Sequence, residues 1–184
     1  MLRGRPTRAR EVVRKPRSQR PSELWVLVVD ASASTRRHGA LTQAKGLLGT
    51  VLEQAYQQRV RIAVLHATGM QAQWPFQGQK RSAAMLAWVS DLGAGGGTPL
   101  IEALVQTGDW LTQRQRSKPA EQQKVLVITD GRLREWPTLP PMACPALVVD
   151  IESAPIRLGR AQVLAEQLGA QYRHIESLPP ALRM

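Results

Sequence analysis

The sequence predicts an α/β fold in which a mostly parallel sheet carries helices on both faces and ends in one short antiparallel edge strand. Two apolar runs, within residues 24–29 and 124–129, are each followed at once by aspartate, and such uninterrupted runs are typical of strands buried on both faces. Segments with helical spacing separate the strand-like runs, and this alternation is typical of parallel sheets. The 184 residues are 43% hydrophobic, which is enough for one ordinary domain with its own core.

The first strand is predicted at residues 24–29 and leads into a crossover helix. From residue 40 to about residue 57, apolar side chains recur at spacings of three and four, which is the stripe of an amphipathic helix. They are Leu41, Ala44, Leu47, Leu48, Val51, Leu52 and Ala55.

The middle of the sequence predicts a strand, an edge strand and a helix. Residues 60–66 form the second strand, and residues 71–74 form the short edge strand, reached through a turn at residues 68–69. Residues 80–91 look helical. The glycine-rich residues 93–97 are predicted to form a loop, because so many glycines disfavour helix and strand.

The helix after this loop has a clear N-terminal signature. Thr98 is expected to cap it, Pro99 to lie in its first turn, and Glu102 to face its positive end. The helix is predicted to end near Arg114.

The last elements complete the alternation of strands and helices. After the strand at residues 124–129, we predict a strand at residues 146–150, a helix at about 158–168 and a final short strand at 172–175.

The formal net charge of +11 is concentrated in residues 1–20, which hold eight basic residues and one acidic residue. This segment has few apolar residues and no aromatic residue, so it is predicted to be a disordered tail. A solubilising linker, a contact with an acidic protein and, least favoured, a contact with nucleic acid remain alternatives for it. We place one domain at residues 21–178 and a C-terminal tail at 179–184.

Cysteine usage and hydropathy bear on the compartment. Cys144 is the only cysteine, which excludes an intramolecular disulfide and fits a reducing compartment. It has no second cysteine or evident base nearby in sequence and is interpreted as a small buried residue rather than a nucleophile. No apolar segment is long enough to cross a membrane. A cytoplasmic protein without a membrane partner is therefore expected.

Five oxygen-bearing side chains fall where the carboxyl ends of the predicted parallel strands meet, which is where such sheets bind ligands. Asp30, Ser32 and Ser34 alternate after the first strand, Thr98 follows the glycine loop, and Asp130 follows a second buried strand. Two carboxylates and three hydroxyls suit hard cations such as Mg²⁺ or Mn²⁺ better than zinc. We predict one divalent cation, with Mg²⁺ preferred, and a coordination shell open to a carboxylate from another protein.

These motifs resemble a known family. DASAS, the threonine of GGGTPL and the aspartate of ITDGR are similar to the metal-ion-dependent adhesion site of von Willebrand factor A domains, which have a Rossmann-like fold. All five ligand positions are filled. Ala33 stands where many relatives have glycine, but this position supplies no ligand.

A narrower resemblance covers nearly everything from about residue 20. VVDAS, QAKGLL, GAGGGTPL, VLVITDGR and LAEQLGAQYRHI are similar to the C-terminal domain of the D subunit of magnesium chelatase and to its cobaltochelatase relatives. The resemblance implies a component of a complex that inserts Mg²⁺ into protoporphyrin, or cobalt during cobalamin synthesis. The chain has no phosphate-binding loop motif, so it is expected to be a non-catalytic adaptor without ATPase activity. Its implied partners are an AAA+ ATPase subunit and a large metallating subunit, one of which donates an acidic residue to the cation.

Other interpretations remain open. The domain could instead regulate or assemble another AAA+ ATPase unrelated to tetrapyrroles, while an independent hydrolase is not expected. His38 and the arginines Arg132 and Arg134 are candidates for the rim of the cation site. Residues 74–76, Trp-Pro-Phe, are interpreted as packing of the edge strand rather than as a contact patch.

Overall fold

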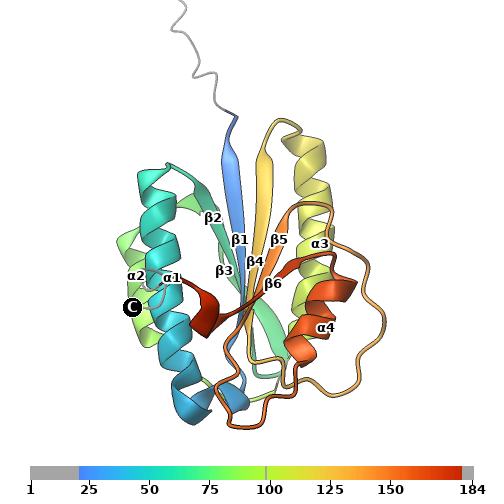
Figure 1. The fold of residues 1–184 in the computed structure, drawn as a ribbon. Helices are drawn as coiled ribbons and strands as arrows, with labels where there is room; N and C mark the ends of the chain where they lie inside the picture. The colour runs from blue at the N-terminus through green and yellow to red at the C-terminus, as the bar shows by residue number, and fades with distance from the viewer. Residues whose placement is uncertain (1–20, 98, 180–184) are drawn as a thin grey trace, which may run out of the picture.

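The computed structural model describes residues 21–97 and 99–179, apart from the side chains of residues 36–38. Within this part of the chain, six strands form one sheet in the order β3-β2-β1-β4-β5-β6 (Figure 1). All neighbouring strands are parallel except the antiparallel pair β2–β3. The strands are β1 (Glu23–Asp30), β2 (Arg61–Thr68), β3 (Gln71–Lys80), β4 (Gln122–Thr129), β5 (Ala146–Asp150) and β6 (Gln171–His174). The α/β class and the antiparallel edge strand are confirmed.

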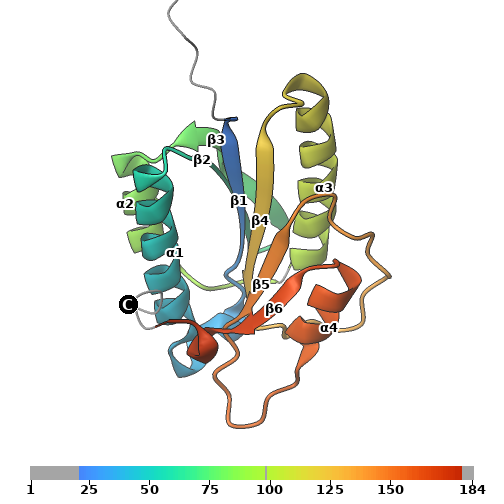
Figure 2. The ribbon, with the colours of Figure 1, turned by 45° about the horizontal axis from the view of Figure 1, so that its top comes forward.

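The helices cover both faces of the sheet. Figures 1 and 2 show α1 and α2 on one face and α3 and α4 on the other. The α-helices are α1 (Ala40–Gln57), α2 (Ala83–Asp91), α3 (Leu100–Ser117) and α4 (Arg160–Gln167), and two 3-10 helices are η2 (Ala33–Gly39) and η3 (Ile175–Ser177).

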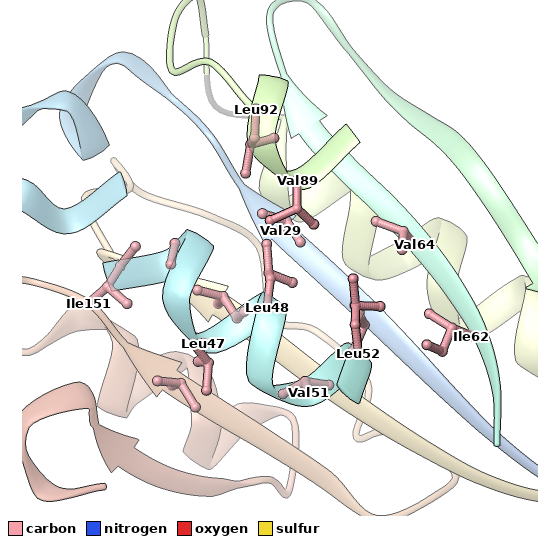
Figure 3. Close-up of a cluster of buried hydrophobic side chains, with 14 of the residues drawn as sticks. Val29, Leu47, Leu48, Val51, Leu52, Ile62, Val64, Val89, Leu92 and Ile151 are labelled. Atoms are coloured by element: carbon pink, nitrogen blue, oxygen red, sulfur yellow. The ribbon is translucent and has the colours of Figure 1, made fainter. Parts of the chain in front are cut away.

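The apolar stripe of α1 packs on β1 and β2. Leu48 and Leu52 are almost fully buried and lie against Val29 and Ile62 (Figure 3). A second cluster on the opposite face joins the inner sides of α3 and α4 to β1, β4 and β5. Burial of both faces explains why β1 is apolar from Leu24 to Val29.

The strand order reverses between β1 and β4. From β1 the chain goes through α1 to β2 on one side, whereas β4 pairs with β1 on the other side. Loops after β1 and β4 therefore leave the sheet at its lower end in Figure 1, at the strand switch point where open α/β sheets bind ligands.

Two predicted boundaries were wrong. The edge strand extends to Lys80 rather than ending near residue 74, because shifts of register against β2 let pairing continue past Pro75. Proline is tolerated there because β3 is an edge strand. Pro99 occupies the N-cap position of α3, without a side-chain hydrogen bond, so the cap predicted at Thr98 falls one residue later.

The predicted start of α2 was also early. The helix begins at Ala83, where the hydroxyl of Ser82 accepts a hydrogen bond from the backbone N–H of Met85. The tail predicted at residues 1–20, and all but the first residue of that predicted at 179–184, lie outside the described residues.

Candidate metal centre

The end of β1 and the loop after it bring three polar residues together at the carboxyl end of the sheet. The backbone N–H of Ser32 donates to Asp30 Oδ1 at 3.0 Å, which folds the chain back over the carboxylate. The hydroxyls of Ser32 and Ser34 lie 2.9 Å apart and share a hydrogen bond. Asp30 and Ser32 are buried, and Ser34 is half-buried. The three predicted residues of this loop are therefore adjacent in space.

Thr129, which the sequence analysis did not single out, joins this loop to β4. Its hydroxyl donates to Asp30 Oδ2 at 2.7 Å and accepts a hydrogen bond from the backbone N–H of Gly131 at 2.9 Å. The next residue, Asp130, is also buried, and its Oδ1 accepts from the backbone N–H of Arg132 at 3.1 Å. Both oxygens of Asp30 are thus held in place by hydrogen bonds.

The electrostatics of Asp30 are unfavourable for a carboxylate. Burial, and then the nearby charge of Asp130, raise its pKa from 3.8 to about 6, against the opposing effect of the hydrogen bonds from Thr129 and Ser32. Among the described residues, no lysine or arginine side chain forms an ion pair with either aspartate. Two buried carboxylates close together are the arrangement that a divalent cation stabilises.

The glycine loop is tied to the β1 loop by a short network. The hydroxyl of Thr68 donates to the carbonyl oxygen of Gly95 at 2.8 Å and to that of Ala31 at 3.3 Å. The backbone N–H of Gly95 also donates to Ala31 at 3.0 Å. Ala31 lies between Asp30 and Ser32, so this network fixes the glycine loop against the candidate ligands.

Close backbone contact explains two of the glycines in this loop. A Cβ atom on Gly96 would lie 2.6 Å from Gly69 Cα, and one on Gly97 would lie 2.7 Å from the Gly69 carbonyl oxygen. Thr98, the remaining predicted ligand, lies outside the described residues. The structure therefore brings together Asp30, Ser32, Ser34 and Asp130 of the five.

A second polar network borders the site. The Arg132 guanidinium lies 3.5 Å from Glu152, which is buried, and Asp150 accepts hydrogen bonds from the backbone of Glu152 and from the Tyr172 hydroxyl. Burial and that hydrogen bond raise the pKa of Tyr172 to about 12. Arg134 is exposed, and the side chain of His38 is not described.

The remaining polar and aromatic residues of interest have packing roles. The rings of His66 and Trp88 pack perpendicular to each other, and burial lowers the pKa of His66. Cys144 is half-buried with a raised pKa, which fits an unreactive thiol. Trp74 packs on Trp110, as predicted for the edge strand. Among residues 21–97 and 99–179, no cluster of three or more His, Cys, Asp or Glu side chains suits a metal.

The fold and the site together define a class of protein, an α/β domain with a mostly parallel sheet and a group of acidic and hydroxyl side chains at the strand switch point. The chain belongs to the von Willebrand factor type A domain family, whose model matches residues 25–132.

Two curated relatives extend over most of the chain. An uncharacterized protein of Mycobacterium tuberculosis is 32% identical over 91% of this chain, and the magnesium-chelatase 67 kDa subunit of Chlorobaculum parvum is 32% identical over 83%. The chain spans 28% of the length of each of these relatives.

Solved structures agree with the fold. The manganese-loaded TRAP protein of Plasmodium vivax gives a TM-score of 0.60 at 17% identity, over 88% of this chain and 73% of that one. A von Willebrand factor type A protein of Catenulispora acidiphila gives a TM-score of 0.54 at 19% identity, over 87% of this chain and 39% of that one. Within the described residues, no helix combines the length and apolar character needed to span a membrane.

Proposed function

We propose that this domain binds one divalent cation, preferably Mg²⁺, and uses it to attach one subunit of a chelatase-type complex to another. The observation that carries the proposal is the pair of buried aspartates, Asp30 and Asp130, at the strand switch point with no described basic side chain paired to either. Without a cation, the hydrogen bonds to Asp30 offset only part of the cost of its burial and of the nearby charge of Asp130, since its pKa is still raised.

The donor set fits Mg²⁺ or Mn²⁺ by its chemistry. Asp30, Ser32, Ser34 and Asp130 offer only oxygen atoms, and the hydroxyls of the two serines already lie within 2.9 Å of each other. Thr98 is proposed as the fifth ligand, as its sequence motif implies. Bound there, the cation supplies an electrophilic point for an incoming carboxylate, while the residues of this chain hold and orient it.

The chelatase context rests on the relatives. A magnesium-chelatase 67 kDa subunit is 32% identical over most of this chain, and the motifs that resemble the D subunit include the proposed ligands. We infer an adaptor between an AAA+ ATPase subunit and a large metallating subunit, acting on Mg²⁺ or cobalt in tetrapyrrole synthesis. The cytoplasm remains the predicted compartment.

Co-purification tests this function. The full chain, carrying a tag, is expected to retain an ATPase or large subunit of a chelatase from the same cells in Mg²⁺ and to lose it in EDTA. Asp30→Ala should lose the partner in both buffers. Asp109→Ala, which removes an exposed aspartate from α3, is the matched control and should retain it.

Two outcomes would reject the proposal. Partner binding that withstands both EDTA and Asp30→Ala would remove the role of the cation. Metal-dependent recovery of an ATPase from outside tetrapyrrole synthesis would retain the adaptor but reject the chelatase context.

A further inference from the structure

The amino ends of the parallel strands carry a groove that the proposed function does not use. The groove lies between the last turns of α3, the start of β4 and the loop before β5, and its volume is about 700 Å³. Ligand sites in proteins usually measure roughly 300–1,000 Å³. In Figure 1 the end of α3 and the start of β4 lie at the upper end of the sheet, opposite the candidate cation site. The groove is therefore separate from that site.

The lining of the groove combines apolar side chains with neutral amides. Leu111, Cys144 and Pro145 supply apolar surface, and Gln123 supplies an amide. Gln123 is only 9% exposed, and its Nε2 has no hydrogen-bond partner among the described residues. An unpaired buried amide is costly, because it has lost its hydrogen bonds to water. Gln123 is therefore a donor available to a ligand that brings a carbonyl or carboxylate oxygen.

The charged side chains that line the groove are basic. They belong to Arg116 on α3 and Lys124 on β4, and no aspartate or glutamate of the described residues lines the groove. Lys124 is paired with Glu23, whereas exposed Arg116 forms no ion pair with a described residue. A basic residue in the last turn complements the helix dipole, but the guanidinium of Arg116 still lacks a carboxylate partner.

The basic N-terminal segment joins the domain beside this groove. The backbone N–H of Gln122, a lining residue, donates to the carbonyl oxygen of Ser22 at 2.9 Å. Residues 1–20, which precede Ser22 closely, hold eight basic residues and one acidic residue. Positive charge from two parts of the chain is thus brought to one end of the domain, where it attracts an acidic ligand.

An acidic protein segment suits these features better than a nucleic acid does. Binding of single-stranded nucleic acid usually combines basic residues with aromatic side chains that stack on the bases. Neither the described lining of the groove nor residues 1–20 contain an aromatic residue. Apolar surface and an unpaired amide instead match the side chains and carbonyl oxygens of a peptide.

We propose that this groove binds an acidic segment of a partner protein, with apolar side chains of the segment against Leu111 and Pro145 and a carboxylate facing Arg116. The groove and the candidate cation site lie at opposite ends of the sheet. Binding in the groove is therefore independent of the metal and goes beyond the proposed function.

A displayed library of random peptides, incubated with the immobilised full chain in EDTA, tests the proposal. Bound peptides are eluted with concentrated NaCl. We expect the eluted sequences to combine aspartate or glutamate with large apolar residues, and a synthetic peptide of that sequence to bind equally well in EDTA and in Mg²⁺. Recovery of no peptide, or of peptides without an acidic preference, would overturn the proposal.

Cys144 reports whether the peptide occupies the groove. It is the only cysteine of the chain and lines the groove in a half-buried position. Saturating peptide should slow alkylation of its thiol by iodoacetamide about fivefold or more, as measured by mass spectrometry. An unchanged rate would place the peptide elsewhere and reject the proposed site. Equal protection by a single-stranded DNA of random sequence would reject the preference for an acidic protein segment.

Two arginine variants assign the charge contact. Arg116→Ala should bind the synthetic peptide roughly tenfold more weakly than the parent chain. Arg173→Ala removes the same charge from an exposed position on β6 and should bind normally. Urea denaturation verifies that both variants are folded. Equal peptide affinity in the two variants would contradict the contact with Arg116.

Gln123→Met tests the unpaired amide. This change keeps the approximate shape of the side chain and removes the amide, so it should weaken peptide binding without lowering the unfolding free energy. Full peptide affinity in this variant would show that the amide of Gln123 does not contact the ligand.

Discussion

The hydroxyl of Thr129 on β4 donates a 2.7 Å hydrogen bond to the buried carboxylate of Asp30 on β1. This bond spans the strand switch point and links the two loops that carry the candidate ligands. It fixes one oxygen of Asp30, while the backbone N–H of Ser32 fixes the other. Two oxygen atoms of the candidate site are therefore already fixed in place, which is expected to lower the cost of binding the proposed cation.

Replacing Thr129 tests this organisation. Thr129→Val keeps the shape of the side chain but leaves Asp30 Oδ2 and the N–H of Gly131 without their partner, and should cost about 1–3 kcal/mol of unfolding free energy. Mg²⁺ affinity should fall about tenfold. Thr129→Ser retains the hydroxyl and should preserve most of both quantities, as measured by urea denaturation and calorimetry. Equal Mg²⁺ affinity in the valine and serine variants would contradict the account.

The raised pKa of Asp30 predicts a pH dependence of the metal-free protein. Because the folded-state pKa of about 6 exceeds the ordinary value of 3.8, the folded chain binds more protons in this range than the unfolded chain does. As the pH rises from about 4 to about 6, ionisation of buried Asp30 therefore lowers the unfolding free energy. Above about pH 6 this destabilisation stays constant.

The variant Asp30→Asn isolates this effect. In EDTA, we compare the unfolding free energy of this variant with that of the parent chain. The variant's advantage over the parent should be greater at pH 7.5 than near pH 4.5, by on the order of 2 kcal/mol. Urea denaturation at both pH values measures the difference. If the two chains differ by the same amount at each pH, Asp30 does not carry the burial penalty assigned to it.

The glycine loop offers a test with a close control. Gly97→Ala would place a Cβ atom 2.7 Å from the Gly69 carbonyl oxygen, so the loop must shift, at a cost of about 1–3 kcal/mol in unfolding free energy. Gly108→Ala lies within α3 with no atom near the new Cβ and should stabilise the helix by about 0.5–1 kcal/mol. In thermal denaturation, the midpoint temperature should fall for Gly97→Ala and rise for Gly108→Ala. An unchanged midpoint for Gly97→Ala would show that the packing against Gly69 is not rigid.

The architecture was predictable because the spacing of the apolar residues distinguishes the buried strands from the amphipathic helices. The bounds of α1 and β5 agree with the prediction, since the stripe of α1 is complete and the apolar run of β5 begins after Pro145 and ends in Asp150. The length of β3 was not predictable from pattern alone, because pairing past Pro75 depends on register shifts against β2.

The candidate site was predictable in part. Asp30, Ser32, Ser34 and Asp130 follow buried strands, so topology alone places them at one edge of the sheet. The roles of Thr129, Thr68 and Glu152 depend on contacts between distant segments, and for Thr68 and Glu152 nothing in the sequence indicates them. One signal was available for Thr129, because a polar residue that ends a buried apolar run needs a hydrogen-bond partner.

Titration of the purified, metal-free full chain with MgCl₂ in a calorimeter is the most direct test of the central claim. The account predicts one Mg²⁺ bound per chain, no binding by Asp30→Ala or Asp130→Ala, and unchanged binding by Asp109→Ala. A parent chain that binds no Mg²⁺, or an Asp30→Ala variant that binds it as tightly as the parent, would contradict the account.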